Sequence, residues 1–412
     1  MMQINRRELL TGLGGLAVTE ALAQTPPSAS PGRIFPRQSD FAIPAGLTYL
    51  NGAYTHPMPV AALEAVHQYC ERRLRPGNMT APGNASMVQA AKEEFTALIN
   101  ARPSEISFIP NTSTGENLVV NGLGIPGSGG NVVTDALHFE GAIIHLQALQ
   151  RERGLDLRIA MPRDGRIDLR DLERLTDRKT RLIEISLVAM YNGFQHDLKA
   201  VCDLAHTHGA YVYADIVQAA GATPIDVRAS GVDFCACSGF KWLMGDFGAG
   251  FLYAREDLLP RIRRSQYGYH SVTEMATHFL PWDPPGKAPF SWKAGTDAGT
   301  TFEVGSYACA PVAALSASLP YIRALGVERI EAHRQPLLAR LRQEMPRLGF
   351  EPMTPAGTKS ALITFLVKDR QPVLERLQKA NVNVRLGDHF IRISPSVYND
   401  LRDIERLLEA LS

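Results

Sequence analysis

Short runs that are apolar throughout alternate with longer stretches of helical spacing in the first two thirds of the chain. Helical spacing marks residues 115–124, 139–154 and 197–209, and Gly154 and Gly209 are expected to end the last two helices. The apolar runs are residues 106–110, 131–136, 155–160, 181–190, 210–216, 232–238 and 249–254. Strands that are apolar on both faces and alternate with helices are typical of a parallel sheet covered on both sides. We therefore predict an α/β core over roughly residues 50–300.

The segments on either side of this core have a different pattern. Residues 59–74 and 86–101 read as helices, the first with Pro59 at its start and the second capped by Asn84. The C-terminal part mixes helices and strands. Its expected elements are two long helices within 308–349, strands at 360–368, 381–386 and 390–394, and helices at 371–380 and 399–411. This mixture indicates a smaller α+β domain.

We divide the chain into residues 1–35, a large domain at 36–305 and a small domain at 306–412. The segment 266–300 breaks the pattern of the large domain, because it is long and rich in glycine, proline and aromatic residues. Long loops of this kind are often functional lids. Its candidate pocket residues are Tyr269, His270, Trp282 and Trp292, although packing within the loop explains them equally well.

Composition and charge exclude several function classes. The 412 residues are 45% hydrophobic with a net charge of +1, so no basic field indicates a nucleic-acid partner. After the first few dozen residues, no apolar run approaches the roughly 20 residues that a membrane span needs. The five cysteines are sparse and odd in number, which does not indicate a disulfide framework, and we expect no metal site.

The N-terminus has the layout of a secretory signal. Arg6 and Arg7 precede a modestly apolar stretch, then Ala21-Leu22-Ala23 and a Pro/Ser linker follow. Paired arginines favour the twin-arginine route, which predicts a periplasmic or secreted protein. Glu20 within the apolar part departs from this pattern, and the alternative is a basic tail on a cytoplasmic protein.

Three polar residues follow two neighbouring predicted strands. Asp215 lies near the carboxyl end of its strand, where open α/β sheets bind ligands, and Gln218 comes three residues later. Lys241 follows the next strand, so it can reach the same edge. A buried lysine is nucleophilic toward an aldehyde, and a carboxylate keeps a pyridine nitrogen protonated. These are the groups that pyridoxal 5′-phosphate (PLP) requires.

The stretch NTSTGEN at 111–117 opens a predicted helix after a strand, which makes an anion site for the phosphate. Each of these signals is weak alone, since the hydroxyls could be plain caps and Asp215 could belong to a structural ion pair. Their joint order along one chain is much more specific. The glycines of 122–130 do not open a helix after a strand, which argues against a dinucleotide-binding fold.

These residues resemble the class V aminotransferase family of fold-type I PLP enzymes, which includes cysteine desulfurases, kynureninases and isopenicillin-N-epimerase-like proteins. The resemblance extends from TYLNGAYTHPMP (48–59) to the C-terminus and is most marked in LINARPSEISFIPNTSTGEN, SGFKWLMGDFGAG, FEVGS and IRISPSVYND. It implies the fold-type I architecture, with a mainly parallel sheet in the large domain and a smaller C-terminal α+β domain.

The resemblance also implies roles for individual residues. Lys241 would form the Schiff base with the cofactor, Asp215 would pair with its ring nitrogen, and Gln218 would bond its 3-oxygen. The other implied residues are Phe139 stacking on the ring, Thr112, Ser113 and Ser238 on the phosphate, Ser306 on the phosphate from the neighbouring subunit, and Arg392 on the substrate carboxylate. His270 is added as a substrate-binding candidate from the 266–300 segment. A homodimer with shared active sites follows from Ser306.

Three departures from the family pattern narrow the function. Many relatives have histidine before the lysine, where this chain has Phe240, and Phe139 stands where histidine is frequent. Desulfurases carry a nucleophilic cysteine near the last strands, and VNVRLGDHFIRIS has none. These departures argue against a desulfurase and point toward the kynureninase and epimerase side of the family. Our first expectation is an amino-acid aminotransferase. The alternatives are a PLP-dependent lyase, hydrolase or epimerase, then a cysteine desulfurase or a non-catalytic binding protein. The sequence names no substrate.

Overall fold

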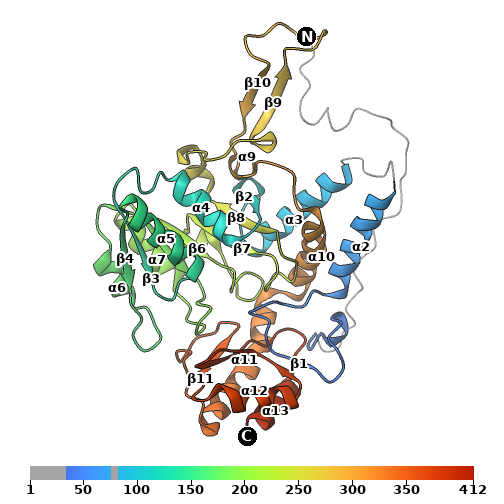
Figure 1. Cartoon of the computed structure of the whole chain (residues 1–412), viewed down its shortest axis with the longest axis vertical. Helices are drawn as coiled ribbons and strands as arrows, with labels where there is room; N and C mark the ends of the chain where they lie inside the picture. The colour runs from blue at the N-terminus through green and yellow to red at the C-terminus, as the bar shows by residue number, and fades with distance from the viewer. Residues whose placement is uncertain (1–33, 76–81) are drawn as a thin grey trace.

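The computed structural model describes residues 34–75 and 82–412, and its centre is a seven-stranded sheet (Figure 1). The predicted signal segment, apart from residues 34 and 35, lies outside the described residues. The strands in spatial order are β2 (Ile106–Ile109), β8 (Gly250–Ala254), β7 (Phe234–Ser238), β6 (Tyr211–Asp215), β5 (Thr180–Ser186), β3 (Asn131–Asp135) and β4 (Asp156–Ala160). All neighbours are parallel except those of β8, which is antiparallel to both β7 and β2. The α/β prediction is confirmed, with this one reversed strand.

Two helical layers bury the sheet because alternate strand residues are apolar on each face. On β6, Val212 and Ala214 face one core, while Tyr213 faces the other. The first layer contains α3 (Pro82–Ile99), α6 (Leu169–Leu175), α7 (Leu198–Thr207) and α10 (Cys309–Leu325). The second contains α4 (Thr112–Gly122), α5 (Glu140–Arg153) and α9 (Ala298–Phe302). The remaining elements here are α2 (Val60–Leu74), α8 (Val227–Ser230), η1 (Gln38–Asp40), η2 (Pro103–Glu105) and η3 (Glu256–Arg261).

The small domain has its own apolar core around a three-stranded antiparallel sheet (Figure 1). Its elements are α11 (Val327–Glu344), η5 (Met345–Leu348), β11 (Ile363–Leu366), α12 (Arg370–Lys379), β13 (Arg385–Leu386), β14 (Phe390–Ile393) and α13 (Leu401–Leu411). The N-terminal strand β1 (Thr48–Tyr49) pairs with β12 (Val382–Asn383) of this domain. Helix α10 follows the boundary predicted after residue 305, yet it packs in the core of the large domain through Val312, Leu315 and Leu319. The position of this boundary therefore stays a prediction.

Three local predictions are wrong. Helix α3 begins at Pro82, so Asn84 lies inside the helix rather than at its cap. Strand β5 ends at Ser186 because the chain then leaves the sheet, with Val188 bridging Gln195. The segment 266–300 is not a structureless loop. It contains η4 (Tyr269–Ser271) and a hairpin of β9 (Val272–Thr277) and β10 (Phe290–Ala294), which projects away from the sheet in Figure 1.

No single helix among the described residues is long and apolar enough to cross a membrane. One pair, Cys309–Leu325 with Val327–Leu348, meets the length and composition test only when joined, and it is bent by 72°.

Candidate active site

The carboxyl ends of neighbouring parallel strands bring the predicted residues to one edge of the sheet. Ser186 ends β5 directly beside Asp215, which ends β6. Ser238 ends β7, and Lys241 follows three residues later. Because these strands are parallel, their ends and the turns that follow them meet at a single cavity.

This cavity has a volume of about 160 Å³, and most of the predicted cofactor residues line it. The lining residues are Asn111, Thr112, Ser113, Phe139, Ser186, Val188, Met190, Asp215, Val217, Gln218, Ser238, Phe240 and Lys241. Sequence reasoning missed Ser186, whose hydroxyl accepts a hydrogen bond from the Phe139 N–H at 3.2 Å and lies 2.9 Å from His138 Nδ1. The parallel register of β5 with β6 was the signal that could have found it.

Asp215 is buried and Lys241 is half-buried in this cavity, and the two charged groups do not touch each other. Burial lowers the pKa of Lys241 to about 8, and the nearby Asp215 opposes this shift. Burial raises the pKa of Asp215 to about 6, while a 2.8 Å hydrogen bond from the Val217 N–H and the charge of Lys241 lower it. Their N and O atoms form no ion pair within 4.0 Å. The two groups therefore flank a space rather than neutralise each other.

Gln218, which lines the same cavity, is held by two hydrogen bonds. Its Nε2 donates to the Ala53 carbonyl at 3.0 Å, and its Oε1 accepts from Trp242 Nε1 at 3.0 Å. An amide nitrogen carries two hydrogens, so one remains for a ligand in the cavity. Trp242 directly follows Lys241 in the chain, and its almost completely buried indole fixes the side chain of Gln218.

The N-terminus of α4 forms the end of the cavity that faces Ser238. Asn111 caps the helix, with its Oδ1 accepting from the Thr114 N–H at 2.9 Å. The Thr112 N–H donates to Ser238 Oγ in a long hydrogen bond of 3.4 Å. Hydroxyls and first-turn N–H groups at the positive end of a helix attract an anion. Thr112, Ser113 and Ser238 therefore lie together as the sequence predicted.

Arg392 on β14 lies at the edge of the cavity and has an unsatisfied guanidinium. Its Nη1 donates to the carbonyl of Met190, a lining residue, at 2.8 Å. Its Nε is buried without a hydrogen-bond partner among the described residues. Burial lowers the pKa of Arg392 to about 10, and Arg385 adds to this effect. A buried cation with free donors indicates an anionic ligand.

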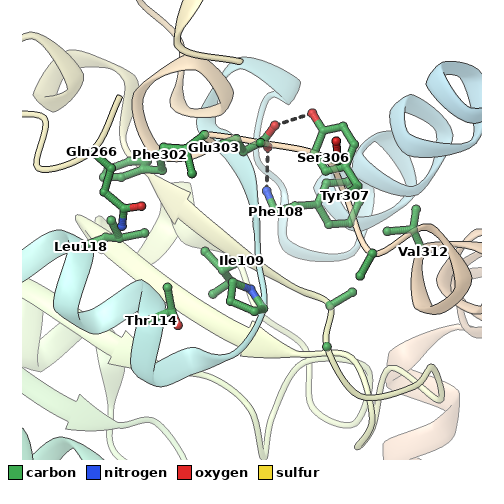
Figure 2. Close-up of a pocket in the computed structure, with 16 residues that line it drawn as sticks. Phe108, Ile109, Thr114, Leu118, Gln266, Phe302, Glu303, Ser306, Tyr307 and Val312 are labelled. Carbon is green, nitrogen blue, oxygen red and sulfur yellow. Dashed lines mark hydrogen bonds between the residues drawn. The ribbon is translucent and has the colours of Figure 1, made fainter. Parts of the chain in front are cut away.

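Ser306 and His270 do not line this cavity within one chain. Ser306 lines a second cavity of about 350 Å³ beyond the N-terminus of α4, where Glu303 accepts from the Phe108 N–H and the Tyr307 hydroxyl (Figure 2). The His270 ring lies 4.8 Å from the Tyr307 ring. Their assigned roles stay predictions. Among the described residues, no group of three or more metal-binding side chains is present.

The aromatic residues assigned to the pocket from 266–300 lie elsewhere. Trp282 and Trp292 belong to the projecting hairpin segment and are 78% and 55% exposed. Tyr269 is 63% exposed at its base. Phe240, by contrast, lines the cavity and stacks on Phe247 with ring centroids 4.1 Å apart.

Comparison with known proteins identifies relatives of most of the chain. The family model for aminotransferase class V matches residues 48–407. A probable cysteine desulfurase of Streptomyces coelicolor is 30% identical over 403 residues, covering 93% of this chain and 90% of the relative. One of Methanothermobacter thermautotrophicus is 28% identical, covering 88% and 93%.

Solved structures share the fold. The cysteine desulfurase CsdA from Escherichia coli has a TM-score of 0.78 at 22% identity, covering 90% of this chain and 96% of that chain. A mutant of C-DES, with glycine covalently linked to the PLP cofactor, has a TM-score of 0.79 at 23% identity, covering 91% and 99%.

Proposed function

Because this chain belongs to the class V aminotransferase family of PLP-dependent enzymes, we propose that Lys241 holds the cofactor and that the enzyme breaks a bond at the α-carbon of an amino acid. One observation carries this proposal: an amine with a lowered pKa and a buried carboxylate with a raised pKa line one cavity without forming an ion pair. When bound, PLP supplies an electron sink for the α-carbon. Everything else comes from the chain.

The residues of the cavity fit the cofactor group by group. Asp215, with its raised pKa, is a strong proton acceptor and suits a protonated pyridine nitrogen. The free hydrogen of the Gln218 amide suits the ring oxygen. The N-terminus of α4 with Ser238 would hold the phosphate, and the ring of Phe139 would cover one side of the pyridine.

Arg392 and Lys241 would act on the substrate. The unsatisfied Nε of Arg392 can add a second hydrogen bond to a carboxylate, which orients the α-carbon. The Lys241 amine can remove a proton from that carbon near neutral pH, because its pKa is lowered to about 8. Among the described residues that line the cavity, only Lys241 and Asp215 have ionisable side chains.

A single mobile base favours reactions in which one amine moves one proton, and transamination is such a reaction. Epimerisation through two bases would need a second one, which the described lining residues do not supply. Transamination is therefore the reaction that we assign first. It consumes a keto acid, whereas hydrolysis of a kynureninase type, elimination and epimerisation do not.

A carbon–sulfur lyase is the second candidate, and the names of the relatives favour it. Several are cysteine desulfurases or probable cysteine desulfurases, which indicates sulfur-containing amino acids as substrates. The desulfurase reaction itself would need a thiol near the substrate. The turn between β13 and β14, residues 387–389, has none, and no cysteine lines the cavity. Burial also raises the pKa of the Cys235 and Cys237 thiols, which disfavours the reactive thiolate.

Product analysis separates these reactions. PLP-loaded enzyme is incubated with each of the twenty amino acids, cystine and kynurenine, with and without pyruvate. Transamination predicts alanine formed only with pyruvate, while a lyase predicts pyruvate and persulfide from cystine without a keto acid.

Arg392→Lys should lower kcat/KM about 10- to 100-fold, since a lysine cannot hold the carboxylate with two bonds. No spectral change with any amino acid would refute catalysis.

Subunit arrangement and export complete the proposal. Within one chain, Ser306 lines the second cavity, beside α4. A homodimer would bring Ser306 of one chain to the phosphate end of the cofactor cavity of the other chain.

Arg6 and Arg7 would direct the folded holoenzyme across the inner membrane. Fractionation of the native host tests export, because the proposal requires processed enzyme outside the cytoplasm and full-length protein retained inside would refute it.

A further inference from the structure

Two buried carboxyl groups lie on α4 and β5, which also supply lining residues of the cofactor cavity, and take no part in the mechanism described above. Glu116 lies on α4 one turn after Thr112 and is 2% exposed, and Glu184 lies on β5 and is 0% exposed. The side chains of these two residues are within hydrogen-bonding reach of each other. A pair of carboxylates in this position cannot both be ionised without a large cost.

The two carboxyls differ in the donors that face them. Glu116 Oε1 lies 2.9 Å from Nδ1 of His145 on α5. Neither oxygen of Glu184 has a hydrogen-bond donor among the described residues. A carboxylate accepts hydrogen bonds and donates none, so Glu184 can satisfy its surroundings only as a protonated acid that donates to Glu116. The geometry thus distinguishes the acid from the anion.

The pair lies close to the residue that meets the ring nitrogen. The register of β5 with β6 puts Glu184 beside Tyr213 and Ser186 beside Asp215, on one face of the sheet. The Tyr213 hydroxyl donates to the Thr112 carbonyl at 3.3 Å, which ties this cluster to the phosphate end. The charge of Asp215 acts on Glu116, and by reciprocity the charge of Glu116 acts on Asp215.

We infer that Glu116 and Glu184 share one proton, held on Glu184, and that the remaining charge on Glu116 is a positioning charge that keeps Asp215 basic. Burial raises the pKa of both carboxyls, and the hydrogen bond between them raises the pKa of Glu184 further while it lowers that of Glu116, so Glu184 takes the first proton. The titratable groups that face the pair are His145 from α5 and Tyr213 and Asp215 from β6. Burial lowers the pKa of His145, so a neutral imidazole is its partner.

The proton is tested on the apo protein, independently of the proposed function. In deuterated buffer at pH 7, the infrared spectrum should contain the carbonyl stretch of a buried protonated carboxylic acid. Glu184→Gln should lose this band, and Glu152→Gln, an exposed carboxyl on α5, should retain it. Absence of the band from the wild type, or its persistence in Glu184→Gln, would overturn the inference. The wild-type band keeps the test valid if Glu184→Gln does not fold.

The effect on the cofactor rests on the proposed function and is read from the pH titration of the visible absorbance of the holoenzyme. Glu184→Gln mimics the protonated acid, so its midpoint should stay near that of the wild type. Glu116→Gln removes the negative charge, and its midpoint should fall by about one pH unit. The double variant should match Glu116→Gln. Equal shifts for the two single variants would refute the assignment of charge to Glu116.

Discussion

Lys241 and Asp215 are held in one cavity with protonation equilibria that neither side chain has in water. Desolvation moves the pKa of the lysine down and that of the aspartate up, so each is closer to neutral pH than usual. Such shifts are useful for a base and for a proton acceptor, and they are costly for folding without a ligand.

Lys241→Met should therefore stabilise the apo protein. The amine has a pKa of about 8 when folded and an ordinary value of 10.5, so folding opposes its charge. This cost is present in full below pH 8 and disappears as the pH rises through 10.5. We expect the free energy of unfolding to rise by about 1–3 kcal/mol at pH 7. Denaturant titrations at pH 7 and 10.5 measure it, with Lys293→Met on the exposed hairpin as control. An equal effect at both pH values would contradict the account.

At the residue scale, the sequence predicted several residues that the structure brings to one cavity, but it did not predict where every candidate residue lies. Lys241, Asp215, Gln218 and Phe139 lie in one cavity because the carboxyl ends of parallel strands converge. His270, Trp282 and Trp292 lie outside this cavity within one chain, so their pocket roles stay predictions; aromatic composition does not show in which direction a hairpin projects.

At the element scale, helix α4 begins three residues earlier than its hydrophobic pattern indicates. Asn111 caps it, so Thr112 and Ser113 become first-turn residues rather than loop residues. Most other elements agreed with their predicted ranges. Gly154 and Gly209 adopt positive φ angles, which is why the sequence could locate the ends of their two helices. Strand β8 could not be oriented from sequence, because apolar periodicity does not distinguish parallel from antiparallel pairing.

Asn111→Ala tests the α4 N-terminus. Loss of the cap should cost about 1 kcal/mol of stability and also weaken phosphate binding, because the first turn that holds the phosphate loosens. Asp369→Ala removes a similar cap from α12 in the small domain. Chemical denaturation should show comparable losses in both variants, and fluorescence titration with PLP should show weaker binding only in Asn111→Ala. Equal PLP affinity in both would contradict an anion site at α4.

At the scale of the whole molecule, the projecting hairpin of β9 and β10 exposes several large apolar side chains, of which Phe279 and Phe290 contact each other. Phe279, Trp282, Phe290 and Trp292 are each at least 47% exposed on or beside it. Large apolar groups in such a cluster mark an interaction site. The sequence predicted a homodimer through Ser306, and this hairpin is a surface that could contribute to it.

Trp282→Ser combined with Trp292→Ser should weaken the dimer at least tenfold. Each buried tryptophan contributes about 1.5–3 kcal/mol to association when its ring leaves water, and 1.4 kcal/mol is a factor of ten. Sedimentation velocity over a range of concentrations measures the monomer fraction. Ile144→Ser, an exposed apolar residue of α5, serves as control. A monomeric wild type, or an unchanged dimer in the double variant, would contradict this role.

The central claim is that Lys241 holds PLP in the cavity beside Asp215. The most direct test is to reduce the PLP-loaded enzyme with borohydride, which fixes the cofactor on the amine that holds it, and to locate the added mass by peptide mass spectrometry. The account predicts one label per chain, on Lys241, and a large loss of label in Asp215→Ala. A label on another lysine, or no label after loading with PLP, would contradict it.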